Sequence, residues 1–208
     1  MKKIFTVILF SLISTFVFAE NCINLFFTGS LGNQTRDIDS ERYSFTPSSI
    51  GLVGEYLYIF DKGFCVGGNI GLYFDDSNSI SPVNSIINIS SSVYGTAFSF
   101  APAVGWTYNK GKIFFFQIIG YPIIIHSSEY TSQTNTIGKW TSQREDISRS
   151  ATAIKTGIAP SFEWGWKHIK LGIGGGINLI LADDYYKGEM ASNLGFELAL
   201  TERITFLF

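Results

Sequence analysis

The amino-acid sequence predicts an all-β protein: a single closed antiparallel barrel of eight strands. Three observations lead to this fold class. Apolar and polar residues alternate along eight segments, short and long connections alternate between those segments, and aromatic residues gather beside the short connections. The eight segments are 22–31, 46–60, 64–74, 93–107, 113–126, 151–166, 169–182 and 192–208. The composition, with 21 glycines, 16% aromatic and 15% charged residues, suits many strands and turns, and the length suits one domain.

The last segment shows the alternation most clearly. One parity carries the apolar residues Leu194, Phe196, Leu198, Leu200, Ile204, Phe206 and Phe208. The opposite parity carries Gly195, Glu197, Ala199, Thr201, Arg203 and Thr205. A period of two places these sets on opposite faces of a strand, so the sheet has one apolar face and one small or polar face.

The connections between the segments are sorted by length. The turns at 61–63, 108–112 and 167–168 are tight, whereas 32–45, 75–92, 127–150 and 183–191 are longer and polar. Short turns at one end and long loops at the other, with an even strand count, are typical of barrels that cross the bacterial outer membrane. We therefore expect short periplasmic turns, long extracellular loops and both termini on the periplasmic side.

The N-terminus predicts export. Lys2 and Lys3 precede a mostly apolar run over 4–18, and the small residue Ala19 follows it. This order is typical of a signal peptide, so residues 1–19 are expected to be removed and 20–208 to form the barrel domain. An uncleaved membrane helix is the alternative, but the run is shorter than a usual span.

Aromatic residues supply a further indication of a membrane. Many lie beside the short turns or the C-terminus, among them Tyr56, Tyr58, Trp106, Trp164 and Trp166. Because amphipathic rings favour the membrane–water interface, we expect these side chains to form a periplasmic girdle.

Over essentially the whole mature chain, this pattern resembles the small eight-stranded outer-membrane barrels typified by OmpX and the transmembrane domain of OmpA, and the opacity-type porin-fold proteins. The segment from Gly195 to Glu202 is similar to a stretch common in the last group. The closing run resembles the final strand of such barrels. That resemblance implies that Ile204, Phe206 and Phe208 belong to an assembly signal, with the barrel-assembly machinery and outer-membrane lipid as partners.

Glu202 conflicts with an unbroken last strand. Its parity is that of the lipid-facing residues, and a carboxylate in mid-membrane is costly. Either a bulge near Thr201 shifts the register or a turn shortens the strand. We expect the bulge, because a turn would give an odd strand count.

The opposite parity places charged residues inside the barrel. The inward candidates are Glu55, Asn69, Lys155, Glu163, Glu197 and Arg203. An eight-stranded barrel is narrow, and charges removed from water must pair. We expect Glu–Lys and Glu–Arg bridges that plug the lumen. A narrow ion or small-solute path lined by the carboxylates is the alternative.

One pair of residues raises the question of catalysis. His126 and Ser128 share a face at the end of the fifth segment, and lipid A deacylases and palmitoyltransferases occur on this kind of barrel. The pair vaguely resembles the His-x-Ser of the deacylases, but the Asn that follows that Ser is missing. Glu129 has the wrong parity to orient His126. We therefore predict no enzyme, and keep an outer-leaflet lipid A hydrolase as the lesser alternative.

Cofactor, metal and nucleic-acid functions lack support in the sequence. The net charge is −2, no Lys/Arg block is present, and the histidines and cysteines lack metal-ligand spacing. Cys22 and Cys65 have three interpretations: a periplasmic disulfide, a lipidated Cys22, or two unpaired thiols. The third is favoured, because the first and third strands of such a sheet lie about 9–10 Å apart.

The sequence thus predicts an integral outer-membrane protein with a structural, surface-exposed role. Segments 75–92 and 127–150 are long and polar, and loops are where variable function resides. An adhesive or host-contact role toward an unknown extracellular ligand or surface is the resulting hypothesis.

Overall fold

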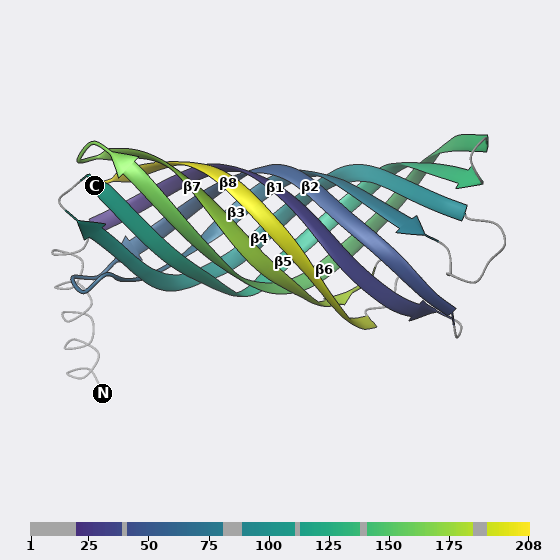
Figure 1. Ribbon diagram of the computed structural model, residues 1–208, viewed down its shortest axis with the longest axis horizontal. Coiled ribbons are helices and arrows are strands. Elements are labelled where there is room, and N and C mark those ends of the chain that lie inside the picture. Colours follow the sequence, from purple (N-terminus) through teal and green to yellow (C-terminus); the bar gives the residue numbers. More distant parts are fainter. Residues whose placement is uncertain (1–19, 39–40, 81–88, 111–112, 138–140, 185–190) are drawn as a thin grey trace, which may run out of the picture.

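A computed structural model describes residues 20–38, 41–80, 89–110, 113–137, 141–184 and 191–208. Eight antiparallel strands follow one another around a closed barrel, and β8 completes the ring by pairing with β1 (Figure 1). The strands are β1 (Glu20–Ile38), β2 (Glu41–Ile59), β3 (Phe64–Ile80), β4 (Ile89–Lys110), β5 (Phe114–Ile137), β6 (Thr141–Gly165), β7 (Ile169–Asp183) and β8 (Ala191–Leu207). The predicted fold class is confirmed. The predicted signal peptide, residues 1–19, lies outside the described residues.

The barrel has two distinct ends. The turn end carries the short connections β2–β3, β4–β5 and β6–β7, and β1 begins there beside the end of β8. Asn21 and Phe208 exchange backbone hydrogen bonds of 3.2 and 2.9 Å at this end. The hairpin end carries the other four connections. Gly63 has a φ of 87°, which glycine adopts at little cost, and it makes the tight β2–β3 turn possible.

Strand stagger fixes the width of the lumen. The stagger is found by following directly opposed residues from strand to strand around the barrel, starting at Gly120 on β5. In one direction the path passes Ile158 and Ile177 and reaches Leu198 on β8. In the other direction it passes Val104, Val66, Tyr58 and Asn21 and reaches Phe208. The two ends of this path on β8, Leu198 and Phe208, stand ten positions apart, so the strands are strongly tilted. An eight-stranded barrel of this kind has an interior that side chains can fill.

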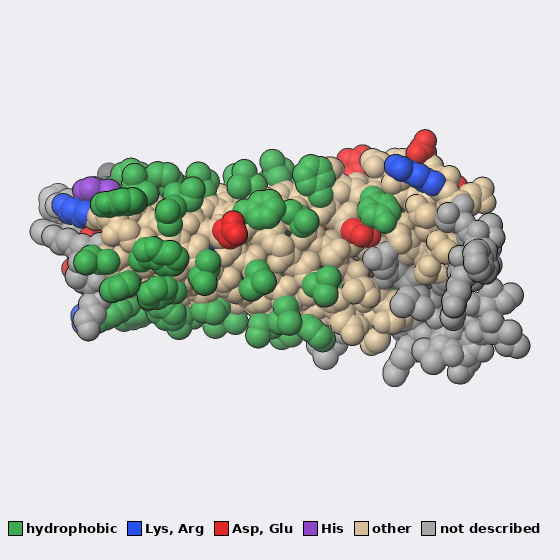
Figure 2. All heavy atoms as spheres, turned by 45° about the horizontal axis from the view of Figure 1, so that its top comes forward, with side chains coloured by type: hydrophobic (Ala, Val, Ile, Leu, Met, Phe, Trp, Pro, Cys, Tyr) green, Lys and Arg blue, Asp and Glu red, His purple; other side chains and the backbone are tan. Residues whose placement is uncertain are grey.

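Side chains alternate between lumen and exterior as the two-residue period predicts. On β8, Glu197 and Arg203 are buried in the lumen, whereas Leu198, Leu200 and Ile204 are exposed on the outside. Figure 2 shows apolar side chains gathered over the turn end and the middle of the barrel, with a more polar hairpin end.

The strands are longer than predicted at the hairpin end. Residues 127–150 were expected to be mostly loop, yet β5 and β6 continue as a ladder from the Ser132–Asp146 pair to the Ile137–Thr141 pair. Similarly, β3 and β4 stay paired up to Ile80 and Ser90. The predicted loops were too long because their polar residues interrupt the apolar alternation without interrupting backbone hydrogen bonding.

The bulge predicted near Thr201 is absent. Residues 195–206 of β8 keep a continuous register with both β1 and β7, and Glu202 lies opposite Phe27 and Ile173. Its carboxylate is therefore exposed on the outer face among apolar neighbours. The prediction was wrong because hydrogen bonds to two neighbouring strands hold the register whatever the side chain of one residue.

Register shifts occur elsewhere, and two of them coincide with prolines. The β4–β5 ladder is interrupted between Phe100 and Val104, around Pro102. The β5–β6 ladder is interrupted between Tyr121 and Ile124, around Pro122. Proline has no N–H to donate to a ladder, so these positions favour local irregularity.

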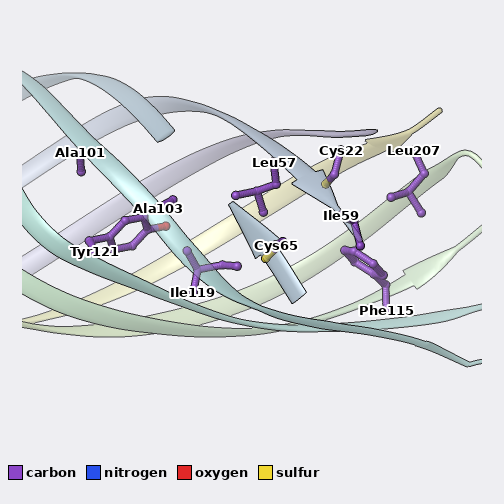
Figure 3. Close-up of a cluster of buried hydrophobic side chains, with 10 residues drawn as sticks. All are labelled: Cys22, Leu57, Ile59, Cys65, Ala101, Ala103, Phe115, Ile119, Tyr121 and Leu207. Carbon is purple, nitrogen blue, oxygen red and sulfur yellow. The ribbon is translucent and has the colours of Figure 1, made fainter. Parts of the chain in front are cut away.

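Apolar side chains fill the lumen toward the turn end. Figure 3 shows this cluster, which we call the apolar plug: Cys22, Leu57, Ile59, Cys65, Ala101, Ala103, Phe115, Ile119, Tyr121 and Leu207. The side chains come from β1, β2, β3, β4, β5 and β8, so strands that are not neighbours in the ring pack against one another through the plug. Among the described residues there is no helix long and apolar enough to cross a membrane.

Candidate functional site

The centre of the lumen holds a buried charge network. Arg203 on β8 donates from Nη2 to Oε1 of Glu55 on β2 at 2.9 Å, and its Nε lies 3.6 Å from Oε1 of Glu163 on β6. All three side chains are almost fully buried. Two carboxylates around one guanidinium leave a negative excess, so hydrogen-bond donors are needed to hold both acids.

Neutral side chains supply those donors. Tyr121 and Asn24 donate to Glu55 at 2.7 Å each, and Gln117 and Ser161 donate to Glu163 at 3.0 and 3.1 Å. Asn24 in turn accepts from Thr205 at 2.6 Å. The charged members of this network were predicted from their parity, whereas Asn24, Gln117, Tyr121 and Ser161 were not singled out, although each shares the inward parity of its strand.

A second ion pair lies closer to the hairpin end. Lys155 on β6 donates from Nζ to Oε1 of Glu197 on β8 at 2.6 Å, and both side chains are buried. The structure thus brings the five predicted lumen charges together as two separate clusters, one around Arg203 and one around Lys155. Asn69, the uncharged inward candidate, is also buried in the lumen.

A third polar cluster contains the suspected catalytic pair. Oδ2 of Asp75 lies 2.7 Å from Nε2 of His126 and accepts a hydrogen bond from Ser128 Oγ at 2.5 Å. The serine hydroxyl therefore donates to the acid. A nucleophile would instead donate to the imidazole that removes its proton. This arrangement holds three side chains together and does not activate Ser128.

Asp75 was missed as a lumen residue because its strand was expected to end at Phe74. Cys65, Asn69 and Tyr73 on β3 face the lumen, and Asp75 continues the same odd-numbered series. Extending the two-residue period past the last apolar residue would have found it.

Two cavities lie on either side of the Lys155–Glu197 pair. The outer cavity, of about 70 Å³, is nearer the hairpin end and is lined by Asp75, Ser128, Tyr130 and Asp183, among others. The inner cavity, of about 80 Å³, is lined by Tyr73, Tyr121, Asn178 and Arg203, among others. Ser49, His126, Lys155 and Glu197 line both cavities and therefore lie between them.

The room beside Tyr73 depends on two glycines. A Cβ added at Gly51 would lie 2.3 Å from the Tyr73 ring, and one added at Gly71 would lie 2.5 Å from it. The inward glycines thus let a large ring fill the lumen instead of leaving a wide channel.

The predicted girdle residues lie near the turn end, and four of the five are exposed. Tyr56, Trp106, Trp164 and Trp166 are exposed on the outer surface. Tyr58 is only 9% exposed, and its ring packs edge-on against Phe60 with 4.9 Å between centroids. Tyr58 has the outward parity of the other girdle residues, but a neighbouring ring packs over it.

The remaining predicted residues are placed as follows. Ile204 and Phe208 are exposed on the outer face, with the half-buried Phe206 between them. Cys22 and Cys65 are free, buried thiols on β1 and β3, and the Cys22 thiol donates to Asn24 at 3.1 Å. His168 lies in the β6–β7 turn with Nδ1 3.0 Å from the Leu207 carbonyl oxygen. Within the described part of the chain, no group of three His, Cys, Asp or Glu side chains could hold a metal ion.

Comparison with known proteins shows distant likenesses in structure. No family model matches the chain, and no curated protein matches its sequence. Surface protein A of Neisseria (NspA) has 9% identity and a TM-score of 0.42, covering 88% of this chain and 96% of that one. Ail, the attachment invasion locus protein of Yersinia pestis, in complex with the heparin analogue sucrose octasulfate, has 12% identity and a TM-score of 0.38, covering 90% and 99%.

A third solved structure is similar at a comparable distance. The translocator domain of the autotransporter NalP from Neisseria meningitidis has 9% identity and a TM-score of 0.34, covering 89% of this chain and 88% of that one. The fold of this chain rests on its own strand pairing, which closes β1 onto β8.

Proposed function

We propose that this chain is an integral outer-membrane β-barrel with a plugged lumen and a surface-exposed role. The observation that carries the proposal is the apolar outer face of the barrel. On β3 the outward residues Phe64, Ile70, Leu72 and Phe74 are all exposed, and the series ends at Asp76. Similar exposed series occur on the other strands, and a protein in water rarely exposes so much contiguous apolar surface.

The height of this band fits a bilayer. Residues 64–74 of β3 rise about 3.3 Å each along a strand tilted by roughly 40°, which gives a band about 25 Å tall. Outer-membrane barrels have an apolar band of about this height, flanked by aromatic girdles. Tyr56, Trp106, Trp164 and Trp166 at the turn end suit the girdle on the periplasmic side.

The contents of the lumen favour a plug over an ion path. Toward the turn end, the apolar plug brings the fully buried side chains of Leu57, Phe115 and Ile119 together. In the middle, Arg203 and neutral hydrogen-bond donors hold Glu55 and Glu163 by direct contacts. An ion would have to replace its hydration shell among these side chains, which offer no continuous polar path through the apolar part.

Assembly and export complete the proposal. The outward Ile204, Phe206 and Phe208 at the end of β8 form the assembly signal read by the barrel-assembly machinery, and residues 1–19 form the signal peptide. In this orientation the hairpin end faces outward. Its polar hairpins, built from β3 to β6, are the surface offered to an extracellular ligand or host surface.

Epitope tags placed at the two ends test the proposal. We expect a tag inserted between β5 and β6, at residues 138–140, to bind antibody on intact cells. The same tag inserted at Asp61–Gly63 should be detected only after the outer membrane is permeabilised. Recovery of the untagged protein in a soluble fraction, or equal exposure of both tags on intact cells, would overturn the proposal.

A further inference from the structure

Asp75, which lines the outer cavity, has one carboxylate oxygen without a hydrogen-bond partner. Its Oδ2 is held by His126 and Ser128, whereas its Oδ1 is buried and has no hydrogen-bond partner. The side chain is only 7% exposed and lines the outer cavity. A buried carboxylate oxygen without a donor costs free energy, so an occupant that brings an N–H or O–H group is favoured there.

The charges around the cavity select a cation. Among the described residues that line it, Asp75, Asp76, Asp183 and Glu197 carry carboxylates. Lys155 contributes a positive charge to the described part of the lining, and its ammonium group is already bonded to Glu197. His126 is directed at Asp75. An anion would meet a carboxylate excess, whereas a positively charged donor satisfies Oδ1 by a charge-assisted hydrogen bond.

The walls of the cavity suit a short apolar chain behind the charged group. Phe45, Tyr130, Ala151 and Ile180 are buried side chains that line it. A volume of about 70 Å³ is roughly twice the ~30 Å³ that one water takes in the liquid, so the cavity holds about two or three linked heavy atoms. An ammonium group has three donors, which suits Oδ1 together with nearby hydroxyl oxygens such as those of Ser49 and Ser77.

We propose that the outer cavity binds a small organic cation, a primary ammonium on a short alkyl chain, through Asp75 Oδ1. The ammonium donates to Oδ1 while the alkyl chain packs on Phe45, Tyr130 and Ile180. The Lys155–Glu197 pair forms the floor and separates the ligand from the inner cavity. This site is additional to the proposed membrane role and does not depend on which surface the hairpins contact.

Titration of the refolded barrel in detergent micelles tests the site with ethylamine, ethanol and acetate. The three small molecules are of similar size and differ in the charge of the head group. The ring resonances of His126, assigned with a His168→Gln variant, report on the cavity by NMR. We expect saturable shifts with ethylamine alone. Asp75→Asn should weaken binding at least tenfold, whereas Glu202→Gln, which removes a carboxylate from the outer face, should leave binding unchanged.

A second variant covers the case in which Asp75→Asn does not fold. Ala151→Phe places a large ring in the same cavity and should abolish binding while His126 and Asp75 stay in place. Heat-modifiable gel mobility shows whether each variant has formed the barrel. The proposal is overturned by unsaturable or absent shifts in the wild type, by an equal response to ethanol or acetate, or by full binding in either folded variant.

Discussion

Arg203 and Glu55 form a buried ion pair, 2.9 Å between Nη2 and Oε1, although 148 positions separate them in the chain. Each side chain is at most 1% exposed. The pair joins β8 to β2 inside the lumen. These two strands are the neighbours of β1 on either side in the ring. Its geometry determines how the barrel responds to the loss of a single charge.

Removal of the guanidinium should strongly destabilise the barrel. Arg203→Met leaves Glu55 and Glu163 buried without a counter-charge, and breaking such a pair costs about 3–5 kcal/mol. Urea unfolding in micelles, followed by tryptophan fluorescence, measures the free energy of unfolding. Arg144→Met, on an exposed part of β6, is the control and should change it by less than about 0.5 kcal/mol.

A compensated variant separates charge from packing. The triple substitution of Glu55→Gln, Glu163→Gln and Arg203→Met removes all three charges, so most of the lost stability should return. A triple variant as unstable as Arg203→Met would show that shape, and not uncompensated charge, dominates.

The apolar plug should keep the barrel electrically silent. Planar bilayers that contain the wild-type protein are expected to show no stable conductance of porin size, because Phe115 and Leu57 fill the lumen below the charge network. Glu163→Gln should be equally silent, since the apolar side chains remain. Reproducible wild-type channels whose ion selectivity changes in Glu163→Gln would instead establish a cation path.

Glu202 should be a source of instability in a bilayer. The carboxylate is exposed between Phe27 and Ile173 on the lipid-facing side, so Glu202→Leu should raise the free energy of unfolding in lipid vesicles by about 1 kcal/mol. Glu129→Leu is the matched control: Glu129 is also exposed, but near the hairpin end, where a charge costs about nothing. A destabilised Glu202→Leu would reveal a partner for this carboxylate.

Deletion of Phe208 should impair assembly and not export. The side chain is 67% exposed at the end of the chain, so its removal exposes little new surface within the barrel. If it belongs to the assembly signal, quantitative fractionation should show less protein in the outer membrane while the signal peptide is still cleaved. Normal outer-membrane levels would exclude this role, and Ile113→Ala, another exposed apolar residue at the turn end, serves as control.

The alternation of side chains was sufficient to predict most of the architecture. The ends of strands such as the one predicted at 169–182 were correct to within a few residues. Along such a strand, glycines and charged residues alternate with Ile and Leu, so every residue indicates which face of the sheet it occupies. The ends at the hairpin side were not predicted. There both faces of strands such as β5 and β6 are polar, so the side chains carry no signal although the backbone pairing continues to Ile137 and Thr141.

By itself the sequence determined the strand count and the grouping of short turns at one end, because these follow from the two-residue period and from local turn chemistry. The same period determined which charged side chains point inward: Glu55, Lys155, Glu163, Glu197 and Arg203. The tertiary structure alone decided that Arg203 contacts Glu55 and Glu163, whereas Lys155 contacts Glu197. It also decided that His126 and Ser128 both bond to Asp75. Glu202 likewise stays on the outer face because of the strand pairing. These outcomes depend on the stagger of ten positions around the ring, which sets the height of every inward side chain relative to those across the lumen. That stagger is a property of eight strands closing together, and no single strand encodes it.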